Sequence, residues 1–331
     1  MNEQTRGTCE LLIENRDRVK SVFPWNGRLL NLACAGIFTV KGRTASEPVL
    51  EECRDLLKRK VGVFSNFRGT ARSPIAAMLA VGGEPERTLG NGLLVYRLLK
   101  KEFRASAYLP VAAMIIAQTV QPSRYEGIAS RTRILYDRMK REHPFLTSGQ
   151  DSAFCALMAL SEKTDDRMIG DAEQCYQRLK PHFFSANAVQ SLSHVLALCD
   201  GRPDGKCAKT LELFEKLKAA GHKYGTDYEL ATLGILAVSG GDPDEIVREI
   251  AEIDDWLSKQ KGFGAFSGVG RTQRLMYAGI VAQKDYLDDG TMQAAAVNGT
   301  ISLIVAQEAA MYAAIAASSA AAAAAGAAAS N

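Results

Sequence analysis

The sequence predicts an all-α protein of about seven antiparallel two-helix repeats of roughly 40 residues, forming an α/α solenoid or a closed α/α toroid. Two observations predict this fold. Short alanine-rich apolar segments recur along the chain, and charged amphipathic segments with an aromatic marker recur between them at the same period. No stretch of strand length alternates apolar and polar residues, so we expect no sheet.

The alanine-rich segments, called A helices below, share one aligned position that carries a small residue. Consecutive positions are 37 to 45 residues apart. A small side chain lets a neighbouring helix approach closely, so we expect the A helices to form the inner of two layers. The aligned residues are Thr39, Ala80, Ala117, Ala159, Ala197, Ala237 and Ala282.

The amphipathic segments, called B helices, carry an aromatic residue at spacings of 40, 40, 38 and 42. An aliphatic residue follows three positions after each of the first four, so ring and aliphatic side chain share one helical face. An additional first helix, about residues 4–21, is expected to cap the array. The markers are Tyr96, Tyr136, Tyr176, Phe214 and Trp256.

Local signals predict where helices begin. Ser73 precedes a proline, Ser123 stands three residues before a glutamate, and Asp242 opens an Asp-Pro-Asp-Glu run, so each is expected to be an N-cap. Trp25, before an Asn-Gly pair, is expected to pack within its turn.

The chain is expected to divide into a repeat domain, residues 1–290, and an alanine-rich segment, residues 291–331, whose single charged residue is Glu308. Alanine favours helix but is weakly hydrophobic, so a membrane span is not favoured. We expect this segment to dock on the last hairpin or on a second copy of the chain, which would make a homo-oligomer. A fraying tail and membrane insertion are the alternatives.

Charge and cysteine content exclude several classes of function. Lysine plus arginine exceeds aspartate plus glutamate by 40 − 37 = 3, too little for a basic face that binds nucleic acid. The first 20 residues are charged and resemble no secretory signal, which predicts a cytoplasmic protein. Seven scattered cysteines have no metal-ligand spacing, so we expect reduced, buried thiols and no metal.

Cofactor motifs are also weak. The glycine-rich segment 262–270 resembles a phosphate-binding loop, but no strand precedes it, so a turn is expected and no cofactor. His194 lies in an A helix and is expected to be a satisfied core residue, whereas His143, His182 and His222 lie near the ends of B helices.

Several long strings resemble a bacterial family of uncharacterised proteins, domain-of-unknown-function family 4003, over nearly the whole chain. The resemblance implies no activity, substrate or catalytic residue. The strings include WNGRLLNLACAGIFTVKGR at 25–43, FSNFRGTARSPIAAMLAV at 64–81, KEFRASAYLPVAAMIIAQT at 101–119 and HKYGTDYELATLGILAV at 222–238.

Polar residues recur eight positions before the aligned small residue, in the first turn of most A helices. Because stacked repeats superpose equivalent positions, these side chains are expected to line a groove along one rim. The acids favour the helix dipole, whereas an arginine there needs an anion, either a neighbouring carboxylate such as Glu229 for Arg274, or a ligand. The candidate groove residues are Arg68, Arg72, Asp151, Asp227, Glu229, Arg271 and Arg274.

Two functions of different class fit this pattern. One is a helical-repeat binding or scaffold protein that takes a protein, a peptide or an anionic small molecule in the groove. The alternative is a toroid enzyme of hydrolase or lyase type that acts on an anionic small molecule, with the arginines orienting the anion and the carboxylates in acid–base roles. The sequence identifies no catalytic residue and leaves open whether the protein is an enzyme.

Overall fold

The computed structural model describes residues 1–63, 65–69, 71–149, 151–264 and 269–283. In these residues every regular element is helical, which confirms the all-α prediction. The B helices are α1 (Glu3–Val22), α3 (Glu47–Lys60), α5 (Pro85–Glu102), α7 (Tyr125–Glu142), α9 (Asp165–Leu179), α11 (Pro203–Ala219) and α13 (Pro243–Ser258). The A helices are α2 (Arg28–Thr39), α4 (Arg72–Gly82), α6 (Leu109–Thr119), α8 (Asp151–Leu160), α10 (Ala186–Leu198), α12 (Leu230–Val238) and α14 (Arg271–Ala282). Two 3₁₀ turns, η1 (Pro122–Arg124) and η2 (Lys180–His182), adjoin α7 and α9.

The chain folds as two compact units. The described part of unit 1 comprises residues 1–10, 134–154 and those from 161 onward, and that of unit 2 comprises residues 11–133 and 155–160. The A and B helices alternate along the chain in both units, as the two period markers predict.

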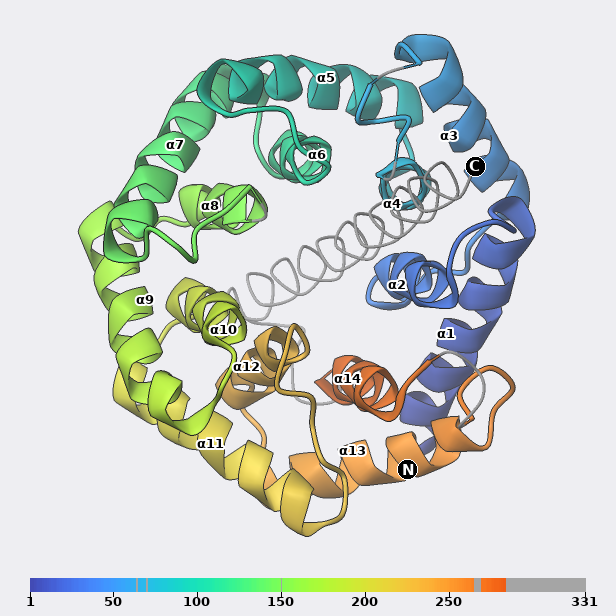
Figure 1. Cartoon of the computed structure of the whole chain (residues 1–331). Helices are drawn as coiled ribbons and strands as arrows, with labels where there is room; N and C mark the ends of the chain where they lie inside the picture. Colours follow the sequence, from blue (N-terminus) through green and yellow to red (C-terminus); the bar gives the residue numbers. More distant parts are fainter. Residues whose placement is uncertain (64, 70, 150, 265–268, 284–331) are drawn as a thin grey trace, which may run out of the picture. The chain divides into compact units, whose positions relative to one another are not determined.

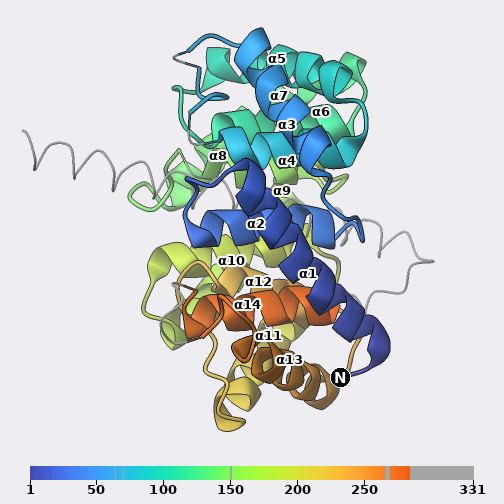
Figure 2. The same cartoon turned by 90° about the vertical axis from the view of Figure 1, so that its right-hand side faces the viewer.

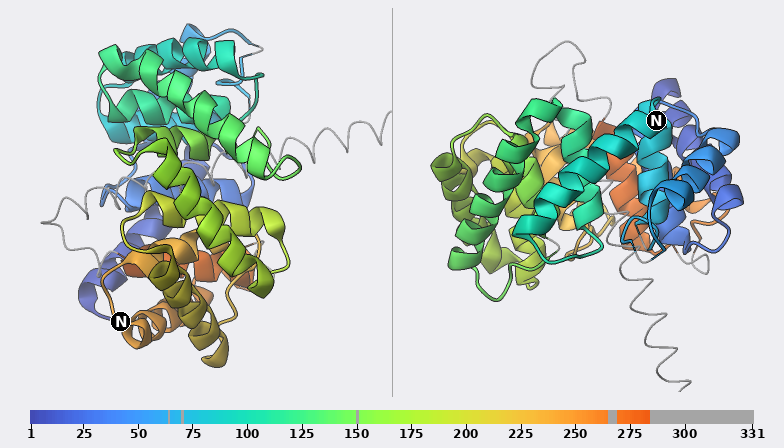
Figure 3. Two further views of the ribbon diagram at one scale, coloured as in Figure 1. Left: turned by 90° about the vertical axis from the view of Figure 1, so that its left-hand side faces the viewer. Right: turned by 90° about the horizontal axis from the view of Figure 1, so that it is seen from above.

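Each unit has two layers of helices. In unit 1, α10 packs on α12 and α12 on α14, whereas α9, α11 and α13 lie side by side in the other layer (Figures 1 and 3). In unit 2, α4 packs between α2 and α6 (Figure 2). The A helices are buried almost all round, so their small residues set the distance between neighbours.

Helix starts agree only partly with the predicted caps. Asp242 caps α13, because its side chain accepts hydrogen bonds from the backbone N–H groups of Asp244 and Glu245. Ser73 is not an N-cap: α4 begins one residue earlier, and Ser73 is buried in its first turn. Ser123 is not one either, because it lies inside η1.

The C-terminal ends of four A helices are closed by a lysine or an arginine. Arg43 Nη1 donates to Val81 O of α4 at 2.8 Å, and Arg131 Nη1 donates to Ala159 O of α8 at 3.0 Å. Lys163 Nζ donates to Ala197 O and Cys199 O at the end of α10, both at 2.7 Å. Lys209 Nζ donates to Ser239 O and Gly241 O after α12 at 2.7 and 2.8 Å. The last carbonyls of a helix have no partner within it and carry partial negative charge. A cationic side chain supplies both a hydrogen-bond donor and an opposite charge.

No helix in the described part of the chain is both long and apolar enough to cross a bilayer. The predicted boundary at residue 290 and the alanine-rich segment 291–331 lie outside the described residues, and both stay predictions.

The close approach of A helices yields a stability prediction at Gly234 of α12. A Cβ there would lie 2.6 Å from Leu192 Cδ1 and 3.4 Å from a carbon of both Val195 and Leu196. Gly234→Ala should therefore lower the free energy of unfolding by about 1–3 kcal/mol. Gly127→Ala is the matched control, since it lies in α7 with nothing within 4 Å, and should raise that free energy by about 0.4–1 kcal/mol. Equal effects of the two variants in urea unfolding would contradict the packing argument.

Candidate functional site

All seven predicted groove residues lie at the start of an A helix or in the loop before it. Arg72, Asp151 and Arg271 are the first residues of their helices, and Glu229 immediately precedes α12. Arg68 and Arg72 belong to unit 2 and the other five to unit 1. Whether the residues form a common groove stays a prediction.

In unit 1 the loops that lead from B to A helices contact the loop or the A helix of the next hairpin. We call residues 143–149, 183–185, 221–229 and 269–270, together with Arg271, the unit 1 rim. Gln190 Nε2 donates to Thr147 Oγ1 at 3.1 Å, and Ser185 Oγ donates to Asp227 Oδ1 at 3.4 Å. Arg271 donates to the carbonyl of Gly221. Loops 183–185 and 221–229 are thus adjacent, and the helices α10 and α14 contact the loop of the preceding hairpin.

Asp151 is a buried carboxyl at the start of α8. Its Oδ2 accepts a hydrogen bond from Ser148 N at 2.7 Å. Burial raises its pKa to about 6, because desolvation outweighs the hydrogen bonds from Ser148.

Asp254 of α13 joins two cationic or polar side chains at the rim. Its carboxylate accepts from Arg274 Nε at 2.6 Å and Nη2 at 3.3 Å, and from His222 Nδ1 at 3.0 Å. Arg274 also donates to Phe263 O at 3.1 Å. Arg274 is therefore paired internally, as one alternative predicted, but the predicted partner Glu229 was wrong. Asp254 lies on a B helix, so the alignment of the A helices could not identify it as the partner of Arg274.

The same acid belongs to a group with metal-like spacing. Ligand atoms of His222, Asp254 and Asp255 lie within 4.8 Å of one another. Both oxygens of Asp254 are already engaged, and the Arg274 charge would repel an ion beside them. The arrangement suits an orienting contact for His222 better than a metal site.

Glu229 is buried, and its two carboxylate oxygens differ in their hydrogen bonding. Oε1 accepts from Gln273 Nε2 at 3.3 Å, whereas Oε2 has no partner in the described part of the chain. A Cβ on Gly225 would lie 2.6 Å from this Oε2, and a Cβ on Gly270 would lie 2.3 Å from Gln273 Oε1. Two glycines therefore make room for these side chains at the rim.

The most exposed apolar side chains among the described residues also lie in loops before A helices. Trp25, Phe145 and Phe184 are 96%, 98% and 100% exposed, and Val63 is 70% exposed. The prediction that Trp25 packs in its turn was wrong, because its ring projects into solvent. The 39-residue spacing of Phe145 and Phe184 matches the repeat and could have identified them.

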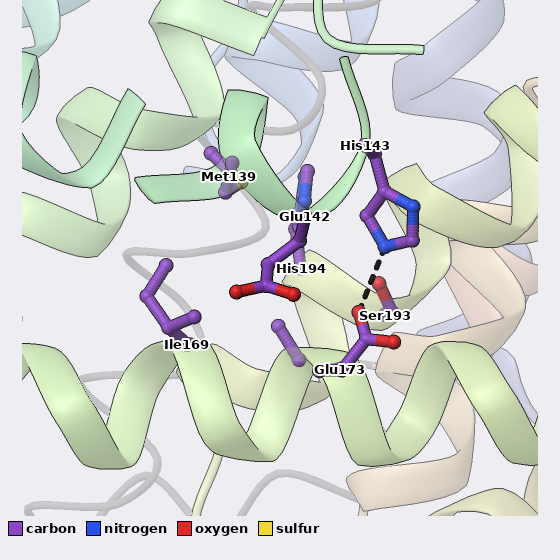
Figure 4. A pocket seen from close by; sticks show the side chains of 8 residues that line it. Met139, Glu142, His143, Ile169, Glu173, Ser193 and His194 are labelled. Carbon is purple, nitrogen blue, oxygen red and sulfur yellow. Dashed lines mark hydrogen bonds and ion pairs between the residues drawn. The ribbon is translucent and has the colours of Figure 1, made fainter. Parts of the chain in front are cut away.

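A small cavity lies between α7, α9 and α10 of unit 1. Figure 4 shows His143 bonded to Glu173 beside it, and the Nε2–Oε2 distance is 2.8 Å. His194 lines the cavity and is buried, but its Nδ1 has no partner in the described residues, so the prediction of a satisfied core histidine was wrong in this respect. Burial, assisted by nearby His143, lowers its pKa to about 3, so the ring is neutral. The cavity volume of about 10 Å³ suits one water molecule and excludes an organic substrate.

Among the thiols, Cys199 is a poor candidate for a reactive group. All seven cysteines are buried and free, as predicted. Burial raises the pKa of Cys199 to about 11, so its thiol is protonated and a poor nucleophile.

Comparison with known families matches residues 15–310 to a family described as protein of unknown function (DUF4003). The uncharacterized protein YeaA of Bacillus subtilis (strain 168) is 22% identical over 269 residues, which cover 80% of this chain and 80% of YeaA. No solved structure matches the chain. The resemblance predicted from the sequence is confirmed, and neither description names an activity.

The raised pKa of Asp151 predicts a pH-dependent stability. Between its ordinary value of 3.8 and about 6, the folded protein keeps a proton that the unfolded chain has lost, so stability falls as pH rises through this window. Asparagine does not titrate, so Asp151→Asn should not lose stability as pH rises through this window. The stability of this variant relative to wild type should grow by about 2–2.5 kcal/mol from pH 4 to pH 7 in denaturant titrations. A difference independent of pH would refute the assignment.

The buried pair of Asp254 and Arg274 predicts a large loss when one partner is removed. Asp254→Asn should lower the free energy of unfolding by about 3–5 kcal/mol, because a buried guanidinium loses its counter-charge. Asp255→Asn, on the exposed neighbouring residue, is the control and should change it by less than about 0.5 kcal/mol. Urea unfolding of both variants measures the contrast.

Proposed function

The chain belongs to the DUF4003 family, whose description names no function, and we propose from its own geometry that it is a helical-repeat binding protein that takes a protein partner on the loops leading into its A helices. The observation that carries the proposal is the near-complete exposure of Phe145 and Phe184 in consecutive loops of the unit 1 rim. Burying one such ring stabilises a complex by about 1.5–3 kcal/mol, and aromatic anchors dominate many protein interfaces.

Polar groups around these rings fit the same kind of partner. Ser185 follows Phe184 and bonds to Asp227, which puts an exposed carboxylate near the ring. Aromatic anchors beside hydrogen-bonding groups are typical of protein interfaces. The carboxylate disfavours docking on an anionic membrane, which attracts basic residues instead.

Photo-crosslinking tests the proposal in the cell. A crosslinking amino acid replaces Phe145 or Phe184, and the control positions are Leu94 and Ile134, which lie on helices and are 44% and 48% exposed. We expect a defined protein crosslinked at 145 and 184 and absent at the controls. Crosslinks to lipid, or the same products at all four positions, would refute a protein-binding rim.

Serine substitutions then measure the energy. Phe145→Ser and Phe184→Ser should change the free energy of unfolding by less than about 0.5 kcal/mol, because neither ring packs in the fold. Each should weaken binding to the captured partner by at least about tenfold. Unchanged affinity in both would contradict the anchor role.

The alternative, acid–base catalysis on an anionic small molecule, is favoured by one contact at the same rim. Asp254 fixes the orientation of His222, a pairing that general bases use. Turnover of an anionic substrate that is lost in His222→Gln and kept in Phe145→Ser would favour an enzyme.

A further inference from the structure

The loops that lead from B to A helices in unit 2 lie beside one another. Arg72, the first residue of α4, places its guanidinium carbon 5.9 Å from the centre of the Phe23 ring in the loop before α2. Asn66 Nδ2 donates to Ser106 O at 2.9 Å, which joins the loop before α4 to the loop before α6. We call residues 20–28, 58–63, 65–69, 71–72 and 97–108 the unit 2 rim.

The unit 2 rim is strongly basic. Its residues include eleven lysines and arginines and a single acid, Glu102. Six of the cations are exposed and make no ion pair or side-chain hydrogen bond within the described part of the chain. They are Lys20, Arg59, Lys60, Arg97, Lys101 and Arg104. Like charges at this density repel one another, so an anionic partner would be bound favourably here.

Compensation of helix dipoles accounts for only part of this charge. Cations in the last turns of α3 and α5 complement the partial negative charge of those helix ends. Arg97, however, lies more than one turn before the end of α5, and Arg104 lies beyond it. The acids collect at the opposite ends, with Glu47 and Glu86 in the first turns of α3 and α5. The net charge of +3 for the whole chain therefore averages over helix ends of opposite sign.

Two apolar side chains project from this basic rim. Trp25 and Val63 are 96% and 70% exposed, in the loops before α2 and α4. Tryptophan is enriched at the surface of a bilayer, where its ring is buried and its indole N–H stays hydrated. An aliphatic side chain that stands three residues after the exposed Lys60 is stabilised in the same layer, because cations attract anionic head groups to it.

The rings of this rim favour a lipid surface over a nucleic acid. Proteins that bind single strands stack bases on exposed rings interleaved with cations. Here Phe67 is buried, and its ring lies 5.1 Å from that of Tyr96 in an edge-to-face contact. Arg133 lies over the Phe103 ring at 5.4 Å. Among the described rings of the rim, Trp25 alone is mostly exposed, and Val63 offers no face for a base.

We propose that the unit 2 rim docks the protein peripherally on a membrane of anionic lipid. The exposed cations bind the phosphate groups of the lipids, and Trp25 and Val63 enter the boundary between head groups and acyl chains. The contact uses none of the residues of the protein-binding rim of unit 1.

Co-flotation of the full chain with lipid vesicles tests the docking. The vesicles contain phosphatidylcholine alone or phosphatidylcholine with about one third phosphatidylglycerol. We expect binding to the anionic vesicles only, with an affinity that falls at least about tenfold when salt rises from ~0.1 M to ~0.5 M, because salt screens exposed charges. Equal binding to both vesicles, or no binding to either, would overturn the proposal.

The fluorescence of Trp25 reports whether its ring enters the bilayer. Trp256→Phe leaves Trp25 as the single tryptophan of the chain. We expect its emission to shift to shorter wavelength with anionic vesicles and to stay unchanged with neutral ones. Polyglutamate and a single-stranded oligonucleotide of equal charge are the competing probes. Tighter binding to either of them, or vesicle binding without a shift, would assign the rim to another polyanion and overturn the membrane contact.

Charge-reversed variants locate the contact. Each cation near an anionic surface strengthens binding about fivefold, so Arg59→Glu/Lys60→Glu should weaken vesicle binding at least about twentyfold. Arg6→Glu/Lys41→Glu is the matched control, since both residues are exposed, unpaired in the described part of the chain and outside the rim. This control changes the net charge equally and should keep most of the binding. Equal losses in the two variants would show that net charge alone is responsible and would overturn the rim.

A second pair of variants separates this contact from the proposed protein partner. Trp25→Ser should weaken vesicle binding about tenfold, because an interfacial ring is lost. Phe184→Ser, which removes an equally exposed ring from the unit 1 rim, should leave vesicle binding unchanged. Both variants should keep the Tm of the wild type, since neither ring packs in the fold. Full vesicle binding by Trp25→Ser, or an equal loss in Phe184→Ser, would overturn docking through unit 2.

Discussion

The burial of the A-helix ends is the constraint on which the rest of this structure depends. Alanine-rich helices that pack on all sides leave some of their last carbonyls away from water, where an unpaired acceptor costs about 1–3 kcal/mol. The sequence meets this constraint with long cationic side chains from the adjoining hairpin. Lys163 and Lys209 are half-buried in this role and Lys206 is buried, and desolvation lowers the pKa of Lys163 and Lys209. Packing the A helices together therefore also requires hydrogen-bond donors for their last carbonyls.

Because of this constraint, the two ends of the A helices have different roles. At the C-terminal ends the charged side chains donate to backbone carbonyls. These residues therefore have a structural role and are not available for a function-specific one. At the N-terminal ends the orphan groups are N–H donors, which short local caps such as Ser185 can satisfy. The loops there do not have to supply long capping side chains, and they carry Phe145 and Phe184, which do not pack in the core.

The repeat was predictable from sequence because close packing and amphipathicity impose a period on residue size. Ala237 and Phe214 carry that signal in adjacent helices, and both are buried as expected. The start of α12 was also predictable from Glu229. The partner of Arg274 was not, because Asp254 lies on a B helix whose register against α14 depends on tertiary packing. Exposure of Trp25 escaped prediction for the same reason, since apolar character does not decide burial in a loop.

The charges around the closing cations differ between the helix ends. At α10, Lys206 Nζ donates to Leu196 O and, at 2.9 Å, to Cys199 O, which also accepts from Lys163, so two cations share this end. The carboxylate of Asp171 lies 3.9 Å from the Lys163 ammonium and offsets part of the repulsion between the two lysines in a partly dry site. At α6 the last residues, Gln118 and Thr119, are exposed. Water can satisfy the carbonyls there, so this end needs no closing cation.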